Sequence, residues 1–125
     1  MPHNQVSAEG PDPVDVHVGS RMREMRLLRG LSQTALGREL GVTFQQIQKY
    51  ERGANRLSAS MLWHAADALN VPISYFFDQI RPGQPIPEQV QASPDEIAMV
   101  RHFRRLPDRL RRTFAELAEI LAEHI

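Results

Sequence analysis

Residues 32–53 read SQTALGRELGVTFQQIQKYERG and predict two short helices joined by a tight turn. Ser32 and Thr43 are placed as N-caps, because their side-chain oxygens can accept hydrogen bonds from backbone N–H groups of the first helical turn. Gly41 lies between the two helices, where a left-handed turn residue is needed. We therefore expect one helix on either side of Gly41, the second ending near Arg52.

The outward face of the second helix carries groups suited to base edges. If Ile47 points into the core, a rotation of about 100° per residue places Gln45 and Lys49 near the opposite pole. Glutamine can bond adenine bidentately, lysine can reach guanine acceptors, and an apolar ring can touch a thymine methyl. Such a face is also typical of a merely solvated helix, and the Phe44 ring could instead pack under the preceding helix. The residues expected to read bases are Phe44, Gln45 and Lys49, with Gln46 and Gln48 at the margin.

Further helices are expected on both sides of this stretch, over about 15–29, 58–69 and 72–77. No segment alternates apolar and polar residues with period two, so we predict an all-α fold: a five-helix domain followed by a C-terminal pair of helices. The core-facing positions expected in the flanking helices are Val18, Met22, Met25, Leu28, Met61, Leu62, Ala65, Ala66 and Leu69.

The zero net charge hides an uneven distribution. Residues 1–15 hold three acids and no Lys or Arg, residues 16–78 hold eight basic and five acidic residues, and residues 79–125 hold seven of each. Phosphate binding depends on the local field rather than on the sum, so the balance does not argue against nucleic acid.

Proline and glycine positions divide the chain into four expected parts. We expect a disordered acidic arm at 1–14, a helix-turn-helix DNA-binding domain at 15–78, a linker at 79–93 and a C-terminal helical segment at 94–125. The linker contains three prolines and one glycine. After it, the order Ser-Pro-Asp-Glu from Ser93 is typical of a capped helix start.

The last helix carries an apolar stripe with spacings of 4, 3 and 4 residues, typical of a coiled coil. The stripe packs either on the main domain, as part of a helical hairpin, or on a second chain, and we favour a homodimer. Six arginines between Arg101 and Arg112 form either a solvated helix face or a second phosphate-binding patch. The residues expected to dimerise are Leu110, Phe114, Leu117 and Leu121.

Several classes of function lack support. The five histidines have no metal-ligand spacing, there is no cysteine, and no glycine-rich phosphate loop is present. We expect no enzyme activity, no catalytic residues, no metal and no cofactor. No run of about 18 apolar residues is present, so we expect no membrane segment, and the lack of cysteine fits a cytoplasmic location.

Residues 17–78 resemble the phage-repressor type of helix-turn-helix domain, the XRE family. The residues that carry the resemblance are Leu36, Leu40, Val42, Ile47 and Tyr50 at the family's apolar positions and Gly41 in the turn. Gly37 departs from the usual alanine, and we expect either residue to be small enough for the helices to cross.

The resemblance implies that helix 43–52 lies in the major groove of double-stranded DNA. It also implies an ion pair between Arg26 and Glu51, in which Glu51 is structural. The residues expected to contact phosphate are Gln33, Thr43, Arg52, Asn55 and Arg56, with Arg21 and Arg38 as weaker candidates.

We therefore expect a sequence-specific transcriptional regulator, most simply a dimeric repressor that reads a two-fold operator. The alternative is an antitoxin or adaptor that binds a partner protein through residues 94–125. A third alternative, a sensor whose C-terminal helices bind a small molecule, has no convergent polar site in the sequence to support it.

Overall fold

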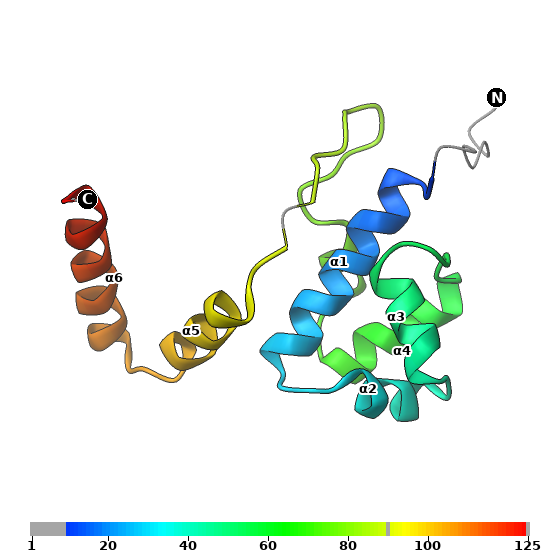
Figure 1. Cartoon of the computed structure of the whole chain (residues 1–125), viewed down its shortest axis with the longest axis horizontal. Coiled ribbons are helices and arrows are strands. Elements are labelled where there is room, and N and C mark those ends of the chain that lie inside the picture. The colour runs from blue at the N-terminus through cyan, green and yellow to red at the C-terminus, as the bar shows by residue number, and fades with distance from the viewer. Residues whose placement is uncertain (1–9, 90, 125) are drawn as a thin grey trace. The chain divides into compact units, whose positions relative to one another are not determined.

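Every regular element in the described part of the chain, residues 10–89 and 91–124, is a helix in the computed structural model (Figure 1). The elements are α1 (Pro13–Leu28), α2 (Gln33–Leu40), α3 (Phe44–Glu51), α4 (Ala59–Leu69), the 3₁₀ helix η2 (Ile73–Phe77), α5 (Pro94–Arg104) and α6 (Asp108–Glu123). The predicted all-α fold is thereby confirmed. The chain divides into two compact units, one up to Gln91 and one from Ala92.

Side-chain caps define where the helices of the first unit begin. Ser32, Thr43 and Ser58 each accept a hydrogen bond from the backbone N–H three residues later, at 3.0, 3.2 and 3.1 Å. Gly41 has a φ of 72° and ends α2 in the left-handed conformation that glycine adopts most readily. These local contacts determine the helix-turn-helix at the positions that the sequence predicts.

Two helix starts differ from the prediction. α1 begins at Pro13, because Asp12 accepts the N–H of Val14 at 2.8 Å and proline suits the first helical turn. The expected arm at 1–14 therefore overlaps α1, and its residues 1–9 lie outside the described residues. Pro72 was expected as a first helical residue, but it is the extended N-cap of η2, with φ −67° and ψ 150°.

The core of the first unit lies between its helices (Figure 1). α1 packs on α3, α4 and η2, while α2 packs on α3 and α4. The buried apolar residues of this core are Val18, Met22, Met25, Leu36, Ile47, Tyr50, Ala65, Ala66, Leu69 and Phe76.

Glycine permits α1 to approach the end of α3. A Cβ atom on Gly19 would lie 2.0 Å from the Tyr50 carbonyl oxygen, so no larger residue fits there without a backbone shift. Gly37 is similar, since its Cβ would lie 2.6 Å from the Val42 carbonyl oxygen. The expectation that alanine at position 37 is also small enough for the helices to cross is therefore wrong for this backbone, because the obstacle is main chain rather than a movable side chain.

A buried ion pair joins α1 to α3. The Nε of Arg26 donates to Oε2 of Glu51 at 2.6 Å, and Nη2 donates to Oε1 at 2.9 Å. The third guanidinium nitrogen donates to the Leu31 carbonyl at 2.9 Å, and the Gln33 amide donates to Glu51 Oε1 at 3.1 Å. Both charged side chains are thus hydrogen-bonded on several sides, which offsets part of the cost of removing them from water.

A single buried imidazole holds both ends of the loop that follows η2. His17 is 3% exposed, and its Nε2 lies 2.9 Å from the Asp78 carbonyl oxygen. The Gln89 amide nitrogen lies 2.9 Å from His17 Nδ1 and 3.0 Å from the Pro87 carbonyl oxygen. A neutral ring with its proton on Nε2 satisfies both contacts, since Nδ1 then accepts. Residues 79–89, expected as linker, thus fold onto α1.

The second unit consists of α5 and α6. Ser93 and Glu96 form a complete capping box at the start of α5. Pro107 has an extended conformation and separates the two helices. At the junction, the rings of Phe103 and Phe114 meet edge to face with centroids 5.8 Å apart.

Removing the carboxylate of Glu51 should destabilise the chain. In Glu51→Ala, Arg26 would remain buried without a charged partner, so the free energy of unfolding should fall by about 3–5 kcal/mol. Thermal or urea unfolding measures the change, and Glu39→Ala, at an exposed acid on α2, is the control. An unchanged melting temperature in Glu51→Ala would show that the ion pair does not stabilise the fold.

Burial lowers the pKa of His17 below its usual value, with a further contribution from Arg21, while the hydrogen bond to the Asp78 carbonyl and the charges of Asp78 and Glu24 oppose this. Because the folded pKa is the lower one, the neutral ring stabilises the fold fully above the unfolded pKa of about 6.5. That stability is lost as the pH falls through 6.5 towards the folded pKa.

His17→Gln should therefore remove part of the loss of stability between pH 7.5 and pH 5.0, measured as urea midpoints. His64→Gln, at an exposed position on α4, is the matched control. If both variants retain the same pH dependence as the parent chain, His17 does not titrate on unfolding in this range.

Candidate DNA-binding surface

α3 separates a buried face from a polar exposed face. Ile47 is fully buried, while Tyr50 and Glu51 are 8% and 3% exposed. The exposed side chains of α3 are Phe44, Gln45, Gln48 and Lys49, and Gln46 is half-buried. The inward residues fix the orientation of the helix, so the outward glutamines and lysine share one surface that is free of the core.

The two aromatic residues of α3 take different positions. Phe44 is 47% exposed at the start of the helix, so its ring does not pack fully under α2. Tyr50 belongs to the core cluster. An exposed aromatic ring next to polar groups suits contact with a thymine methyl in a wet groove.

Side-chain contacts orient two of the residues expected at phosphates. Gln33 is half-buried at the first position of α2, and its amide donates to Glu51. The Thr43 hydroxyl caps α3 by accepting the N–H of Gln46. Both residues thus lie at helix N-termini, where free N–H groups and the helix dipole favour an anion.

The basic and polar residues after α3 differ in exposure and in their side-chain partners. Arg52 is exposed at the C-cap of α3, and Asn55 is half-buried in the following loop. Arg56 donates from Nε to Asp15 Oδ2 at 3.0 Å, although its side chain remains 56% exposed. The contact directs the Arg56 guanidinium to α1.

The two weaker phosphate candidates also differ. Arg38 is exposed on α2. Arg21 lies over the Tyr75 ring at 5.0 Å and donates to Glu24 at 3.1 Å, while the Tyr75 hydroxyl donates to the Arg21 carbonyl. Arg21, which lies on α1, therefore packs on η2, and this structural position argues against a phosphate contact.

Sequence reasoning missed the contacts that connect distant parts of the chain. Arg29 donates to the carbonyls of Leu69 and Asn70 at 2.9 and 3.2 Å, and thereby joins the ends of α1 and α4. His17 makes contacts 61 and 72 residues away. No local motif marks these residues, because their partners are set by helix packing.

Two kinds of feature are absent from the part of the chain that the structure describes. Within the ranges 10–89 and 91–124, no three His, Asp or Glu side chains are grouped so that they could hold a metal ion. No helix within those ranges has the length and apolar character needed to span a membrane. The surface on α3 consists of hydrogen-bonding amides, one cation and one ring.

Comparisons with known proteins agree with the helix-turn-helix seen in the structure. A helix-turn-helix family model matches residues 22–76, which contain α2 and α3. A regulator from Sinorhizobium fredii, described as an uncharacterized HTH-type transcriptional regulator, is 41% identical over 91% of this chain and 90% of its own length.

Two further relatives match over little more than half of this chain. An uncharacterized HTH-type transcriptional regulator from Sinorhizobium medicae is 57% identical over 54% of this chain, and the match spans about half of its length, 49%. A relative from Rhodospirillum rubrum, described as an uncharacterized transcriptional regulator in the ATPase CF(0) region, is 57% identical over 58% of this chain and 67% of its own length. No solved structure is a significant match. The match to the Sinorhizobium fredii protein extends over nearly both full lengths, and the chain therefore belongs to the family of helix-turn-helix transcriptional regulators.

Proposed function

We propose that this regulator binds double-stranded DNA with α3 in the major groove and acts as a dimeric repressor of a two-fold operator. The exposed face of α3 is the observation that carries the proposal. It presents Gln45, Gln48 and Lys49 outward while Ile47 is fully buried. Amide and ammonium groups on one helix face are suited to the acceptors and donors of base edges.

The phosphate contacts in this proposal surround α3. Gln33 and Thr43 offer the N-termini of α2 and α3, and Arg52 and Asn55 follow the end of α3. Arg56 contributes only if its contact with Asp15 opens, so we assign it a smaller share. Such contacts position the protein on the duplex, and the side chains of α3 then select the sequence.

We further propose that α6 forms the dimer by pairing with a second copy of itself. The side chains of Leu110, Phe114, Leu117 and Leu121 are 43, 37, 52 and 59% exposed, and Ile120 beside them is 53% exposed. Their spacing of 4, 3 and 4 residues is the same in both directions. An antiparallel partner can therefore place Leu110 opposite Leu121 and Phe114 opposite Leu117, with every layer apolar.

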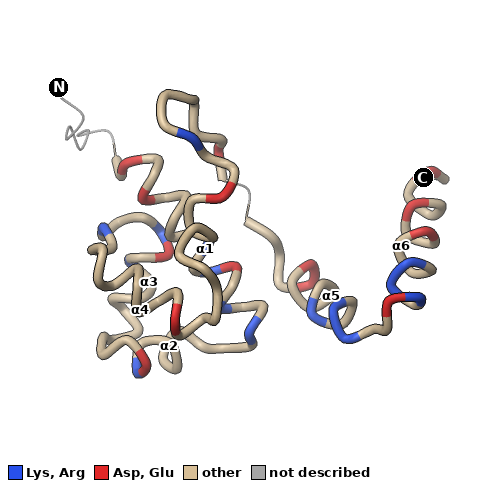
Figure 2. Tube along the Cα trace, turned by 180° about the vertical axis from the view of Figure 1, so that it is seen from behind, with Lys and Arg blue, Asp and Glu red and all other residues tan. Residues whose placement is uncertain are grey.

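The charges of α6 favour a second, antiparallel copy as the occupant of the stripe. The first half contains three arginines and one acid, Asp108, and the second half contains three glutamates and no Lys or Arg. After Asp108 the tube of α6 in Figure 2 accordingly changes from blue to red. This order opposes the helix dipole, which favours acids at the N-terminus and bases at the C-terminus. Antiparallel pairing brings each basic half beside an acidic half.

A partner of a different kind remains the competing assignment, in which the same stripe binds another protein and the chain acts as an antitoxin or adaptor. The α6 stripe supports this reading as well, but the charge order favours self-pairing. The mass of the purified chain in solution discriminates the two, because only self-pairing gives a concentration-dependent dimer without a second polypeptide.

Selection of bound sequences from random DNA tests the proposal as a whole. We expect an enriched motif with two inverted half-sites about one helical turn apart, since each copy would present one α3. Enrichment of a single half-site would contradict the dimeric arrangement, and the absence of any motif would contradict sequence-specific binding.

Shortening the outward side chains of α3 should weaken operator binding. Gln45→Ala and Lys49→Ala should each weaken binding by roughly 5- to 150-fold, because a good base contact contributes about 1–3 kcal/mol. Affinity for unrelated DNA should change less in Gln45→Ala than in Lys49→Ala, which also loses a charge. His64→Ala, at an exposed position on α4, is the control; operator affinities within twofold of the parent would refute this readout.

A charge in the apolar stripe should separate the two copies. Leu117→Glu in the full chain should shift the mass from dimer to monomer, because the glutamate would lie opposite Phe114 of the second copy. Glu119→Gln, at an exposed position of the same helix, should leave the dimer intact. A dimer that survives Leu117→Glu would exclude the stripe as the interface.

The chain contains no cysteine, so single introduced cysteines report the direction of pairing. Antiparallel pairing predicts a disulfide in an equimolar mixture of Phe114→Cys and Leu117→Cys chains, and little cross-linking of Leu121→Cys with itself. Efficient self-cross-linking of Leu121→Cys would instead indicate parallel helices.

A further inference from the structure

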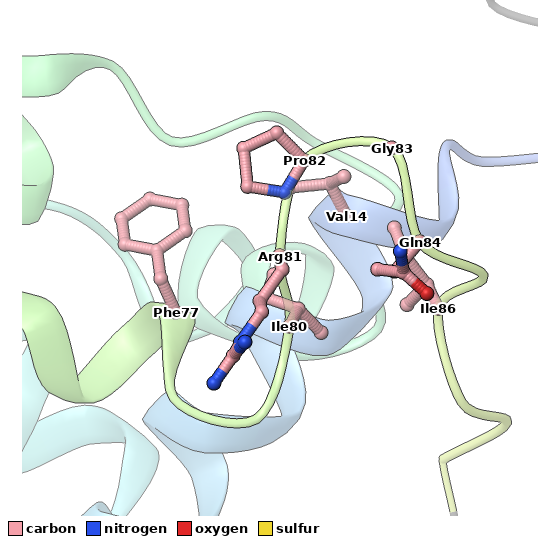
Figure 3. A pocket seen from close by; sticks show the side chains of 8 residues that line it. All are labelled: Val14, Phe77, Ile80, Arg81, Pro82, Gly83, Gln84 and Ile86. Atoms are coloured by element: carbon pink, nitrogen blue, oxygen red, sulfur yellow. The ribbon is translucent and has the colours of Figure 1, made fainter.

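We propose that a pocket beside the start of α1 binds a small apolar carboxylate. The pocket encloses about 430 Å³, within the range of roughly 300–1,000 Å³ typical of small-molecule sites. It is formed by the first turn of α1, the last residue of η2 and the loop after η2 (Figure 3). Its apolar lining consists of Val14, Phe77, Ile80, Pro82 and Ile86.

The contacts of His17 hold the walls of this pocket in place. At the start of the loop the Asp78 carbonyl oxygen lies 2.9 Å from His17 Nε2, and near its end the Gln89 amide nitrogen lies 2.9 Å from His17 Nδ1. The segment between them contains all of the lining residues except Val14 and Phe77. A loop held at both ends loses less conformational freedom when a ligand binds, and this favours affinity.

The charge of Arg81 indicates which class of ligand the pocket would bind. Arg81 is the only charged residue that lines the pocket, and its exposed side chain makes no hydrogen bond or ion pair with any residue in 10–89 or 91–124. The two acids at the start of α1 have other partners, since Asp12 accepts the N–H of Val14 and Asp15 accepts from Arg56.

A free guanidinium beside an apolar pocket matches a ligand with a short hydrocarbon or aromatic body and one carboxylate. The carboxylate can accept two parallel hydrogen bonds from Arg81, and the body can occupy the space between Phe77 and Ile86. A neutral alcohol would lose the charge-assisted contact, and an ammonium would be repelled. The proposal concerns a site separate from α3 and does not depend on DNA binding.

Titration of the full ¹⁵N-labelled chain with octanoate tests the site directly. We expect saturable shifts of the backbone amides of Ile80 and Gly83, with octanol binding at least tenfold more weakly and octylammonium more weakly still. Equal binding of octanol and octanoate would overturn the carboxylate assignment. The absence of saturable shifts with octanoate would overturn the site.

Three variants separate the charge from the cavity. Arg81→Gln should reduce octanoate affinity about tenfold without changing octanol affinity, while Ile86→Trp should fill the pocket and abolish binding of both. Arg38→Gln, which removes an exposed arginine on α2 outside the pocket, should leave both affinities unchanged. Equal losses in Arg81→Gln and Arg38→Gln would show general electrostatic attraction and overturn the role of Arg81.

Discussion

The ion pair between Arg26 and Glu51 is the constraint on which the proposed DNA surface depends. It joins α1 to the last residue of α3, and Gln33 connects α2 to the same carboxylate. A buried pair of this kind contributes little net stability relative to an apolar pair of similar volume, because both charges are removed from water. Its hydrogen bonds are directional, however, so it selects one orientation of α3. The ion pair, on the opposite side of α3, thus determines the direction in which the exposed glutamines of α3 point.

Close backbone approach completes this arrangement. Gly19 brings α1 against the carbonyl of Tyr50, and Gly53, with φ 74°, lets the chain leave α3 where a Cβ would lie 2.7 Å from the Val16 Cα. The end of α3 is therefore held on α1 by main-chain contact as well as by the ion pair. Such contacts act together, because a backbone shift at either glycine would also displace Glu51 from Arg26.

Local chemistry explains what the sequence could predict. Ser32, Thr43 and Gly41 specify the helix-turn-helix through contacts within a few residues, and the observed bounds of α2 and α3 follow from them. The family resemblance supplied the Arg26–Glu51 pair, which periodicity alone does not identify. The two partners of His17 lie 61 and 72 residues after it in the sequence, so no local pattern predicts these contacts. They exist only once α1 and η2 have packed, which is why the proline-rich segment was expected to be a linker throughout.

The folding of residues 79–89 onto α1 bears on how two copies would bind one operator. A helix as short as α3, with eight residues, offers few base contacts, and each contributes only about 1–3 kcal/mol. A second half-site adds affinity in proportion to the effective concentration of the second α3, which is highest when the connecting chain just spans the two half-sites and decreases as the chain lengthens further. Because Gln89 is bound to His17, only residues 90–92 lie between that contact and the Ser93 cap of α5. The segment outside these contacts is therefore shorter than the proline-rich sequence suggests. If two copies pair as proposed, a short connection that still spans the two half-sites favours cooperative binding over independent binding of each.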